Sequence, residues 1–378
     1  MSEAVHVDVI VIGAGIAGAS AAAELAASFT VLLLEAEEQP GYHSTGRSAA
    51  VYLPTYGPAP IRSLTRASGG FLGAPPAGFT EVPLLCAREV LFIAREDQLA
   101  HLDDHFAEHA AERAPIARID GDEVMRRLPL LRSGYAAAGL SDTSGSDIDV
   151  AALHQGYLRL MRQRGGRLLT RARVDSLEHA AGRWLAHTEA GLFSAPVVVN
   201  AAGAWAEQVG QMAGAEVIGL VPKRRTALIV AAPDGMRTDT LPMAVDIDES
   251  FYMKPDAGRL LISPANEDPQ APADAQADEM DIAICIDRVQ RAFDLDIRRI
   301  ENKWAGLRCF VADKSPVIGF SERVPGFFWL AGQGGYGVQS SPAVARLVAS
   351  LIGGRPMPDD IREQGLDPAS ISPGRFAV

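Results

Sequence analysis

The sequence predicts an α/β protein whose larger domain holds a doubly wound sheet and whose smaller α+β domain holds a mixed or antiparallel sheet. Three observations support this prediction: a strand, glycine turn, helix and strand near the N-terminus, a second buried strand at 196–200, and strand patterns at 226–231 and 251–263. The chain has 378 residues, more than twice the usual length of one compact domain, so two domains are expected.

The first element follows from an apolar run at 7–12 that is rich in β-branched residues, which indicates a strand buried on both faces of a parallel sheet. Gly13-Ala14-Gly15-Ile16-Ala17-Gly18 comes next, and a mostly alanine stretch to residue 27 predicts a closely packed helix. A second apolar run at 30–34 ends at Glu35. This order is the one that a dinucleotide-binding βαβ unit requires.

Each residue of this motif has a separate physical role in such a unit. Gly13 permits the tight turn, Gly15 lets the backbone approach a pyrophosphate, and Gly18 lets the helix lie close to the strand. Amides at the start of the helix, around Ala17, face the phosphates, and Glu35 accepts hydrogen bonds from a ribose diol, with Ala36 beside it. The alternative is a glycine-rich helix entry without a ligand, with Glu35 a solvated carboxylate.

The segment at 40–50 bears on which dinucleotide is bound, because the fingerprint alone does not separate a nicotinamide from a flavin cofactor. Small residues and hydroxyls continue directly from the ribose-binding acid and can follow a long cofactor along its pyrophosphate and ribityl chain. We therefore expect FAD; a polar surface loop is the alternative. The expected cofactor contacts here are Ser44, Thr45, Gly46, Arg47, Ser48, Ala49 and Ala50.

Two later segments return to the cofactor domain. The strand at 196–200 leads into a small-residue turn that contains Gly203, and the strand at 327–331 leads into a glycine-rich turn and a helix at about 341–351. The N-terminus of that helix is expected to face the flavin and to stabilise its reduced, negative form, although a packing turn is the alternative. The expected contacts are Gly334, Gly335, Tyr336, Gly337, Val338 and Gln339.

The domains are accordingly predicted to be discontinuous. Residues 1–80, 145–220 and 305–378 are assigned to the FAD-binding domain, and residues 81–144 and 221–304 to the substrate-capping domain. Polar helical stretches at 96–113 and 123–127 belong to the cap, and the Pro- and Asp-rich residues 265–278 are expected to form a surface loop.

Composition and charge limit the classes of protein. Hydrophobic residues make up 48% and charged residues 22%, as in folded globular proteins, and a net charge of −12 disfavours nucleic acid as a partner. Cys86, Cys285 and Cys309 lie too far apart for a disulfide framework or a C-x-x-C metal site, so no metal and a reducing, cytoplasmic location are expected. No apolar run reaches the length of a transmembrane helix, and no secretory signal is recognised.

These motifs resemble the flavin-dependent amine oxidoreductases of the D-amino acid oxidase, glycine oxidase and sarcosine oxidase superfamily, and among them the bacterial D-arginine dehydrogenases. The resemblance implies noncovalently bound FAD in a glutathione-reductase-like domain, a cap over the flavin, and Val174 as a further cofactor contact. The similar segments are 11–20, 39–50, 147–158, 199–205, 222–225, 248–258, 304–313 and 333–337.

Candidate substrate residues begin with two arginines. Arg225 and Arg308 each offer a rigid donor fork suited to a carboxylate, and both match the family's carboxylate-binding positions. Arg225 lies in a basic cluster that could simply be solvated, whereas Arg308 follows an apolar run in which an unpaired cation would be costly. Tyr252 matches a tyrosine that binds the carboxylate, and Tyr56 one on a mobile loop over the substrate; either could instead be a packed aromatic residue.

The resemblance also implies contacts to the rest of the substrate. Glu89 matches an acid that meets a cationic side chain, although Arg88 could be its partner instead. Val51 stands where the D-arginine dehydrogenases carry a histidine, which puts the preference for arginine in doubt. Residues of the C-terminal turn are expected near the substrate as well: Gly335, Tyr336, Gly337 and Val338.

The activity that these residues imply is oxidative deamination of D-amino acids with basic side chains, D-arginine or D-lysine, by hydride transfer from the α-carbon to flavin N5. The imino acid then hydrolyses to a 2-oxo acid and ammonia, and no residue is assigned as the catalytic base. An apolar residue within 259–262, where sarcosine-type oxidases carry a lysine, favours quinone or another acceptor over oxygen. Cys309 is expected to be an unreactive buried thiol rather than a covalent flavin attachment.

Three alternatives remain open. The first is an oxidase or dehydrogenase for neutral or N-substituted substrates such as glycine, sarcosine or proline. The second is a non-catalytic flavin-binding scaffold. The third is a nicotinamide-dependent dehydrogenase.

Overall fold

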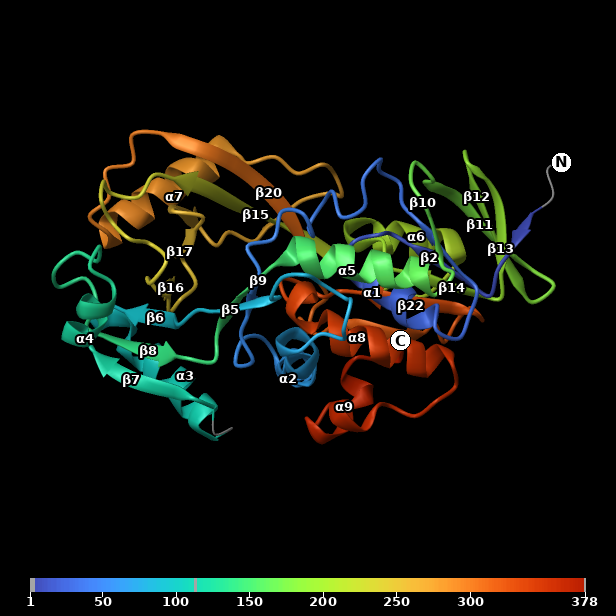
Figure 1. The fold of residues 1–378 in the computed structure, drawn as a ribbon, viewed down its shortest axis with the longest axis horizontal. Coiled ribbons are helices and arrows are strands. Elements are labelled where there is room, and N and C mark those ends of the chain that lie inside the picture. Colours follow the sequence, from blue (N-terminus) through green and yellow to red (C-terminus); the bar gives the residue numbers. More distant parts are fainter. Residues whose placement is uncertain (1–3, 112–113, 377–378) are drawn as a thin grey trace.

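A six-stranded sheet forms the centre of one half of the computed structural model, which describes residues 4–111 and 114–376 (Figure 1). Five neighbouring strands run parallel, and β21 closes one edge in the antiparallel direction. In spatial order the strands are β10 (Arg167–Leu169), β3 (Val31–Leu34), β2 (Val9–Ile12), β14 (Val197–Asn200), β22 (Phe327–Ala331) and β21 (Val317–Phe320).

Both faces of this sheet are covered, as the uninterrupted apolar strand near the N-terminus predicts. Val9 and Val11 of β2 belong to the hydrophobic cluster on one face, whereas Ile10 and Ile12 belong to the cluster on the other. The first face carries α1 (Ile16–Leu25), α2 (Ala59–Gly73), α5 (Val150–Gln163) and α8 (Gly337–Ile352). The other carries α6 (Ala206–Ala213) and the four-stranded sheet β1 (Val5–His6), β13 (Gly191–Ala195), β12 (Arg183–Thr188) and β11 (Val174–Ala180).

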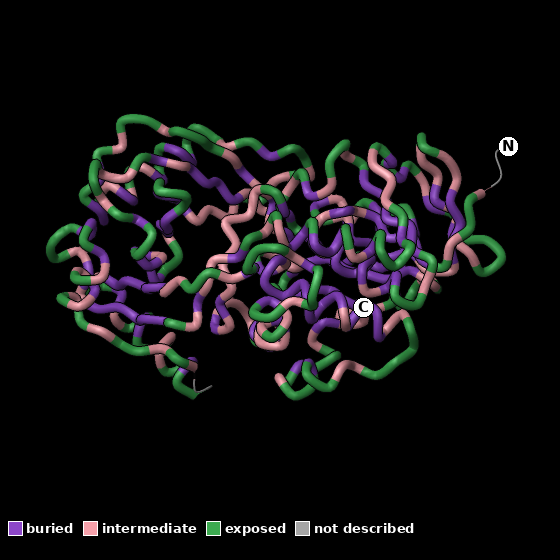
Figure 2. Tube along the Cα trace, viewed as in Figure 1, coloured by how far each residue is buried: buried purple, intermediate pink, exposed green. Residues whose placement is uncertain are grey.

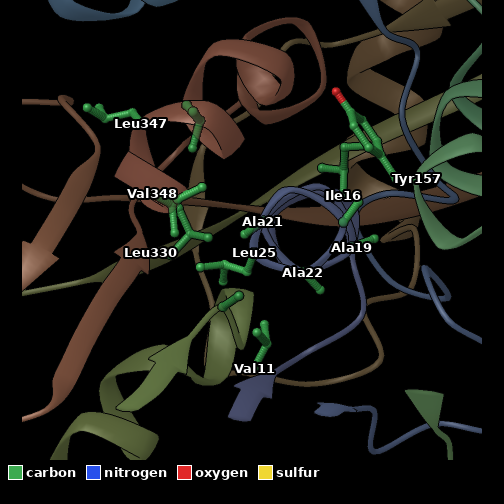
Figure 3. Packing of buried hydrophobic residues seen from close by; sticks show 14 of the residues in the cluster. Val11, Ile16, Ala19, Ala21, Ala22, Leu25, Tyr157, Leu330, Leu347 and Val348 are labelled. Atoms are coloured by element: carbon green, nitrogen blue, oxygen red, sulfur yellow. The ribbon is translucent and has the colours of Figure 1, made fainter. Parts of the chain in front are cut away.

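The alanine-rich composition of α1 is explained by its crowded position. Figure 3 shows its small side chains, among them Ala19, Ala21 and Ala22, turned toward neighbouring elements on several sides. The helix contacts both α8 and α5, and Ala19, Ala21, Ala22 and Ala23 are fully buried. Larger residues at these positions would separate the helices from the sheet. Figure 2 shows that the buried part of the chain is concentrated at the centre of this half.

Helix α8 begins four residues earlier than the sequence predicts, at Gly337 rather than near Ser341. Pro342 lies inside the helix and cannot donate a hydrogen bond to the Val338 carbonyl one turn back. The hydroxyl of Ser341 donates to that carbonyl instead, at 2.9 Å. This local replacement lets the helix continue through a residue that normally marks a boundary.

The other half is a mixed nine-stranded sheet, which lies to the left in Figure 1. Most neighbours are antiparallel, and β16 pairs with β6 in parallel. The path runs β19 (Asp268–Pro269), β15 (Val221–Val230), β18 (Arg259–Ser263), β17 (Tyr252–Asp256), β16 (Met243–Asp246), β6 (Val90–Ala94), β8 (Ala138–Asp142) and β7 (Ile116–Asp120), with β20 (Ile300–Phe310) paired to β15. Its helices are α3 (Leu99–Ala111), α4 (Gly121–Arg127) and α7 (Glu279–Ala292), and η1 (Glu96–Gln98) precedes α3.

One expected domain boundary falls within strand β20. The sequence prediction divides the chain between residues 304 and 305, but β20 continues unbroken from Ile300 to Phe310 and pairs with β15 along this length. Because both ends of the strand share one partner, the whole strand belongs to the nine-stranded sheet. Its C-terminal end brings Arg308 toward the other half of the molecule.

The remaining elements are short. A three-stranded sheet, β4 (Val51–Tyr52), β9 (Ser146–Ile148) and β5 (Leu85–Ala87), lies between the two large sheets. The others are η2 (Gly203–Trp205), α9 (Asp359–Glu363), η3 (Pro368–Ser370) and η4 (Pro373–Phe376). Within the described ranges, no helix has the length and apolar character that crossing a membrane requires.

The cap contains a pH-sensitive contact between α3 and the sheet. His105 packs on Phe92, and its Nε2 lies 3.1 Å from Nε2 of His109. Burial, assisted by the neighbouring His109, lowers the pKa of His105 to about 4. The unfolded chain therefore binds more protons than the folded one between about pH 4 and pH 6.5, so stability is expected to fall as the pH drops through this window.

We expect a loss of about 1 to 2 kcal/mol in the free energy of unfolding between pH 7 and pH 4.5, after allowance for partial solvent screening. Melting temperatures measured across this range for the native protein and His105→Gln test this contribution. The variant should show a flatter profile because it lacks the titrating group. Parallel profiles would exclude His105 as a source of the pH dependence.

Candidate active site

A single cavity of about 540 Å³ runs from the glycine turn after β2 to the inner face of the nine-stranded sheet. Residues from both halves of the molecule line it. Most of the predicted site residues lie on its wall. The exceptions are Gly18 and Gly46, which pack within the cofactor loops, Tyr336, which packs behind Tyr56, and Glu89.

The glycine turn has the geometry that a dinucleotide requires. Gly13 has φ +100°, and a Cβ there would meet the Ala201 carbonyl oxygen at 2.5 Å. A Cβ on Gly18 would lie 1.8 Å from the Gly13 carbonyl oxygen, so the helix approaches the strand as closely as the sequence predicts. At Gly15 the only nearby atom is Thr45 Oγ1, at 3.2 Å, and this side of the turn faces the cavity.

Hydrogen bonds around the turn fix groups that suit the adenosine and pyrophosphate parts of FAD. Thr45 Oγ1 accepts the Ile16 N–H at 2.9 Å, which leaves the hydroxyl proton available for a phosphate oxygen. The Glu35 carboxylate accepts the N–H groups of Ala14 at 2.8 Å and Glu37 at 3.0 Å. These two bonds hold Glu35 on the cavity wall, where its remaining lone pairs can bind a ribose diol.

Two glutamines mark the other end of the cofactor site. Gln333 and Gln339 line the cavity, and their Nε2 atoms are buried without a hydrogen-bond partner among the described residues. The opposite atom of Gln339, Oε1, is occupied because it accepts the Leu53 N–H at 2.9 Å. Buried amide groups left without a partner are costly, so both positions suit a ligand with carbonyl acceptors such as an isoalloxazine ring. The residues present therefore fit FAD.

Cys309 also lines the cavity, close to the expected flavin position. Burial raises the pKa of its thiol to about 12. The thiolate that would attack a flavin is therefore scarce at neutral pH. This agrees with the expectation of an unreactive thiol.

Arg47, in the segment at 40–50, holds the cap loop at 265–278 against that segment. Its guanidinium donates to the carbonyls of Ala275 at 2.8 Å and Ala305 at 3.0 Å, and it pairs with Asp274. The Trp304 indole N–H donates to the Arg47 carbonyl at 2.9 Å. The loop predicted at 265–278 thus lies mostly at the surface, as expected, and is held against the cofactor segment through Asp274 and Ala275.

We expect Arg47→Ala to release FAD about 10 to 100 times faster, because two backbone carbonyls lose their donor and the loop loses its anchor. Asp274→Asn should have a smaller effect, since its carboxylate is half exposed. The rise of free-FAD fluorescence after dilution measures the rate. Equal rates for the native protein and Arg47→Ala would show that this loop does not retain the cofactor.

The pairing of β15 with β20 positions both predicted arginines. Arg225 lies opposite Gly306, and Arg308 is two residues further along β20, so both side chains share the inner face of the sheet. Arg225 Nε donates to the Asn266 carbonyl at 2.9 Å, and its Nη2 lies 3.4 Å from Glu267. The Arg308 side chain has no hydrogen bond or ion pair to any other described residue, and it faces the cavity.

The electrostatics of this pair favour an anion. Burial and the nearby Arg308 lower the pKa of Arg225, although an arginine stays protonated. Two like charges on one cavity wall are stabilised by a ligand with a negative charge between them. Gly335 leaves the necessary room, because a Cβ there would lie 2.8 Å from the Arg308 guanidinium.

Two tyrosines lie at the same end of the cavity. Tyr252 extends from β17 on the inner face, and Tyr56 packs edge-on against Tyr336 with ring centroids 5.2 Å apart. Burial raises the pKa of the Tyr56 phenol well above its usual range, and burial raises that of Tyr336 to about 12. Both phenols therefore keep their protons and act as hydrogen-bond donors at neutral pH.

Glu249 is the acid that sequence reasoning missed. Its Oε2 accepts the Tyr56 hydroxyl at 3.1 Å, and its side chain lines the cavity. It lies in the turn before Tyr252 with φ +53°, and Asp246 fixes this turn by accepting the Ser250 hydroxyl at 2.7 Å. The sequence signal that could have identified Glu249 is its place as an acid in the tight turn just before Tyr252, a candidate site residue.

Glu89 is placed outside the cavity. Its carboxylate pairs with Arg127 of α4 and accepts the Ser141 hydroxyl at 2.5 Å. Val90, the next residue, does line the cavity, so the two side chains lie on opposite sides of the strand. The expected contact between Glu89 and a substrate side chain is therefore absent from this arrangement.

Comparison with known proteins shows the family. Residues 8–351 match the model of the family described as DAO, FAD dependent oxidoreductase. FAD-dependent oxidoreductase domain-containing protein 1 of Xenopus laevis is 27% identical over 41% of this chain and 34% of its own length. Human mitochondrial dimethylglycine dehydrogenase is 26% identical over 66% of this chain and 31% of its own length. The matched region is thus about a third of each of these relatives.

Among solved structures, glycine oxidase from Geobacillus kaustophilus has the same fold, with a TM-score of 0.85. The match covers 97% of this chain and 98% of the other at 22% identity. The α/β fold and the FAD cofactor predicted from the sequence are therefore confirmed. The chain belongs to the DAO family of FAD-dependent oxidoreductases.

Proposed function

We propose that the protein catalyses oxidative deamination of a D-amino acid to a 2-oxo acid and ammonia, with transfer of electrons to an acceptor other than oxygen, such as a quinone. The observation that carries this proposal is Arg308, a cavity-lining guanidinium without a protein partner, beside the buried Arg225. The resemblance of the sequence to D-arginine dehydrogenases supports the D-enantiomer.

The cavity side chains have different roles in binding the substrate. Arg225 and Arg308 hold the substrate carboxylate, and Tyr252 donates a further hydrogen bond to it. Tyr56, bonded to Glu249, covers the substrate and excludes water. When bound, FAD would supply the two-electron acceptor for the hydride that leaves the substrate α-carbon.

Loss of the substrate ammonium proton is favoured by the same arginine pair. Two positive charges near an ammonium group lower its pKa, so the amine is more easily deprotonated before or during oxidation. Tyr56 and Tyr336, whose pKa values are raised by burial, keep their own protons, and no residue is assigned as a general base. Positioning and electrostatic stabilisation are then the main sources of rate enhancement.

The composition of the cavity wall supports an acceptor other than oxygen. None of the described residues that line the cavity is a lysine, the residue that sarcosine-type oxidases place over the flavin. Leu261, in the segment 259–262 that was matched to the one carrying this lysine, is buried and apolar. Reoxidation of the reduced protein is expected to be slow in air and fast with a soluble quinone.

The purified protein is expected to be yellow, and anaerobic addition of a D-amino acid should bleach its flavin absorption. A panel of D- and L-amino acids, glycine, sarcosine and proline measures which substrate reduces the flavin. Failure of every compound to reduce it would support the non-catalytic scaffold instead. A colourless protein that reduces nicotinamide cofactors would contradict the cofactor assignment.

A second candidate is the oxidation of neutral or N-substituted amino acids. The basic substrates expected from the sequence, D-arginine or D-lysine, depend on Glu89 as the partner of a cationic side chain, and Glu89 is paired with Arg127. The second is favoured by the apolar cavity wall near Val51 and Phe92. The likeness to dimethylglycine dehydrogenase and glycine oxidase is consistent with it.

A further inference from the structure

One end of the cavity is apolar and lies beside the arginine pair. Six of its lining residues pack in a single hydrophobic cluster, to which Tyr252 and Tyr56 also belong. We call this region the side-chain compartment, because a substrate whose carboxylate lies at the arginines directs its side chain along the cavity wall. It consists of Val51, Leu53, Val90, Phe92, Met243 and Val245.

Strand register makes this compartment apolar. In β6, Val90 and Phe92 face the cavity, and Leu91 and Ile93 belong to the separate cluster on the other side of the sheet. The neighbouring strand β16 also turns apolar side chains toward the cavity, because its cavity-facing residues Met243 and Val245 pair with Val90 and Phe92. Of the described cavity-lining residues from the nine-stranded sheet, only the two arginines are charged.

The same register puts Glu89 on the side of Leu91. Ser141, which donates to Glu89, pairs with Leu91 across the sheet, and Arg127 reaches Glu89 from α4 on that side. Arg127 is also bound at Nε by Glu123 at 2.5 Å. The Glu89 charge is thus compensated within the protein, with the strand backbone between it and the compartment.

We propose that the side-chain compartment selects amino acids with an uncharged, apolar side chain of about the size of leucine or methionine. This specificity rests on the proposed oxidation of amino acids. A leucine side chain removes apolar surface from water at every wall of the compartment. A lysine or arginine side chain would bring a cation against Val90, Phe92 and Met243 without a partner, at a cost larger than the apolar gain.

The remaining nearby acid does not offset this cost. Glu249 lies in the turn before β17, and its carboxylate is already bonded to the Tyr56 hydroxyl. It is also close to both arginines, whose positive charges it partly balances. A cationic substrate would compete with these contacts.

The test compares kcat/KM for anaerobic flavin reduction by leucine and methionine with that by lysine and arginine, in the enantiomer that the native protein oxidises. The native protein should prefer the apolar pair by at least about 100-fold. Met243→Glu places a carboxylate of similar length in the compartment and should shift the ratio toward lysine by about 100-fold. Met243→Gln, its neutral match, should not raise activity with lysine.

Glu89→Gln is a second control, because it removes a negative charge outside the compartment, whereas Met243→Glu adds one inside it. Because Glu89 lies behind the strand, this variant should keep the native ratio within about threefold. A native protein that prefers lysine or arginine, and loses that preference in Glu89→Gln, would overturn the proposal even if Met243→Glu fails to bind FAD. If no amino acid reduces the flavin, the proposed function itself fails, which is a separate result.

Discussion

Replacing Arg308 with methionine is expected to lower kcat/KM for the amino acid substrate by about 100- to 1,000-fold. Removal of one partner from a buried, hydrogen-bonded charge pair costs about 3 to 5 kcal/mol. Unlike Arg225, the Arg308 side chain has no hydrogen bond or ion pair to a described residue that would compete with the substrate. Methionine keeps most of the length and the apolar contacts of the side chain. The loss should therefore report the missing charge and donor fork rather than an empty space.

Arg308→Lys is the matched variant for this experiment. It keeps the positive charge but lacks the planar fork, so its activity should lie between those of the native protein and Arg308→Met. The FAD content and visible spectrum of each variant show whether the cofactor site is intact. Native kcat/KM in a fully loaded Arg308→Met protein would contradict the assignment of Arg308 to the carboxylate.

Gly18→Ala is expected to weaken FAD binding by at least about 100-fold and to lower the melting temperature, because its Cβ would collide with backbone rather than with a flexible side chain. The calculated separation from the Gly13 carbonyl oxygen is 1.8 Å, so α1 must move away from the turn. That movement displaces the amides that face the pyrophosphate. FAD titration by fluorescence quenching and thermal melting measure the two effects.

Gly70→Ala in α2 is the control, since it makes the same change within a helix. A Cβ at Gly70 meets no atom within 4 Å, and the residue is exposed. Alanine has the higher helix propensity, so this variant should be neutral or stabilised by up to about 1 kcal/mol. FAD affinity in Gly18→Ala equal to that in Gly70→Ala would show that close helix packing is not needed for the cofactor.

Local sequence patterns predicted the features that local geometry determines. The βαβ unit, the buried strands and the small residues of α1 follow from periodicity and from the space at Gly13 and Gly18. The pairing of Arg225 and Arg308 on one sheet face agrees with the carboxylate site that the resemblance implied. The expected domain boundary at 304/305 falls within β20, because this strand continues through its pairing with β15, about eighty residues earlier.

Long-range contacts explain what the sequence could not provide. Glu249 meets Tyr56 across 193 residues, and Arg47 meets Asp274 across 227. Glu89 shows the sensitivity of strands to register: one position along the chain, Val90, faces the cavity, whereas Glu89 lies on the other face. A match of residue types therefore did not determine which side of the sheet each carboxylate occupies.

If Arg225 and Arg308 hold the substrate by its carboxylate, an amine that lacks only this group should be a poor substrate. Anaerobic flavin reduction by the best amino acid of the panel is therefore compared with reduction by the corresponding amine. We expect rapid bleaching by the amino acid and reduction by the amine that is at least about 100-fold less efficient. Equal reduction by the two compounds, or faster reduction by the amine, would contradict this expectation.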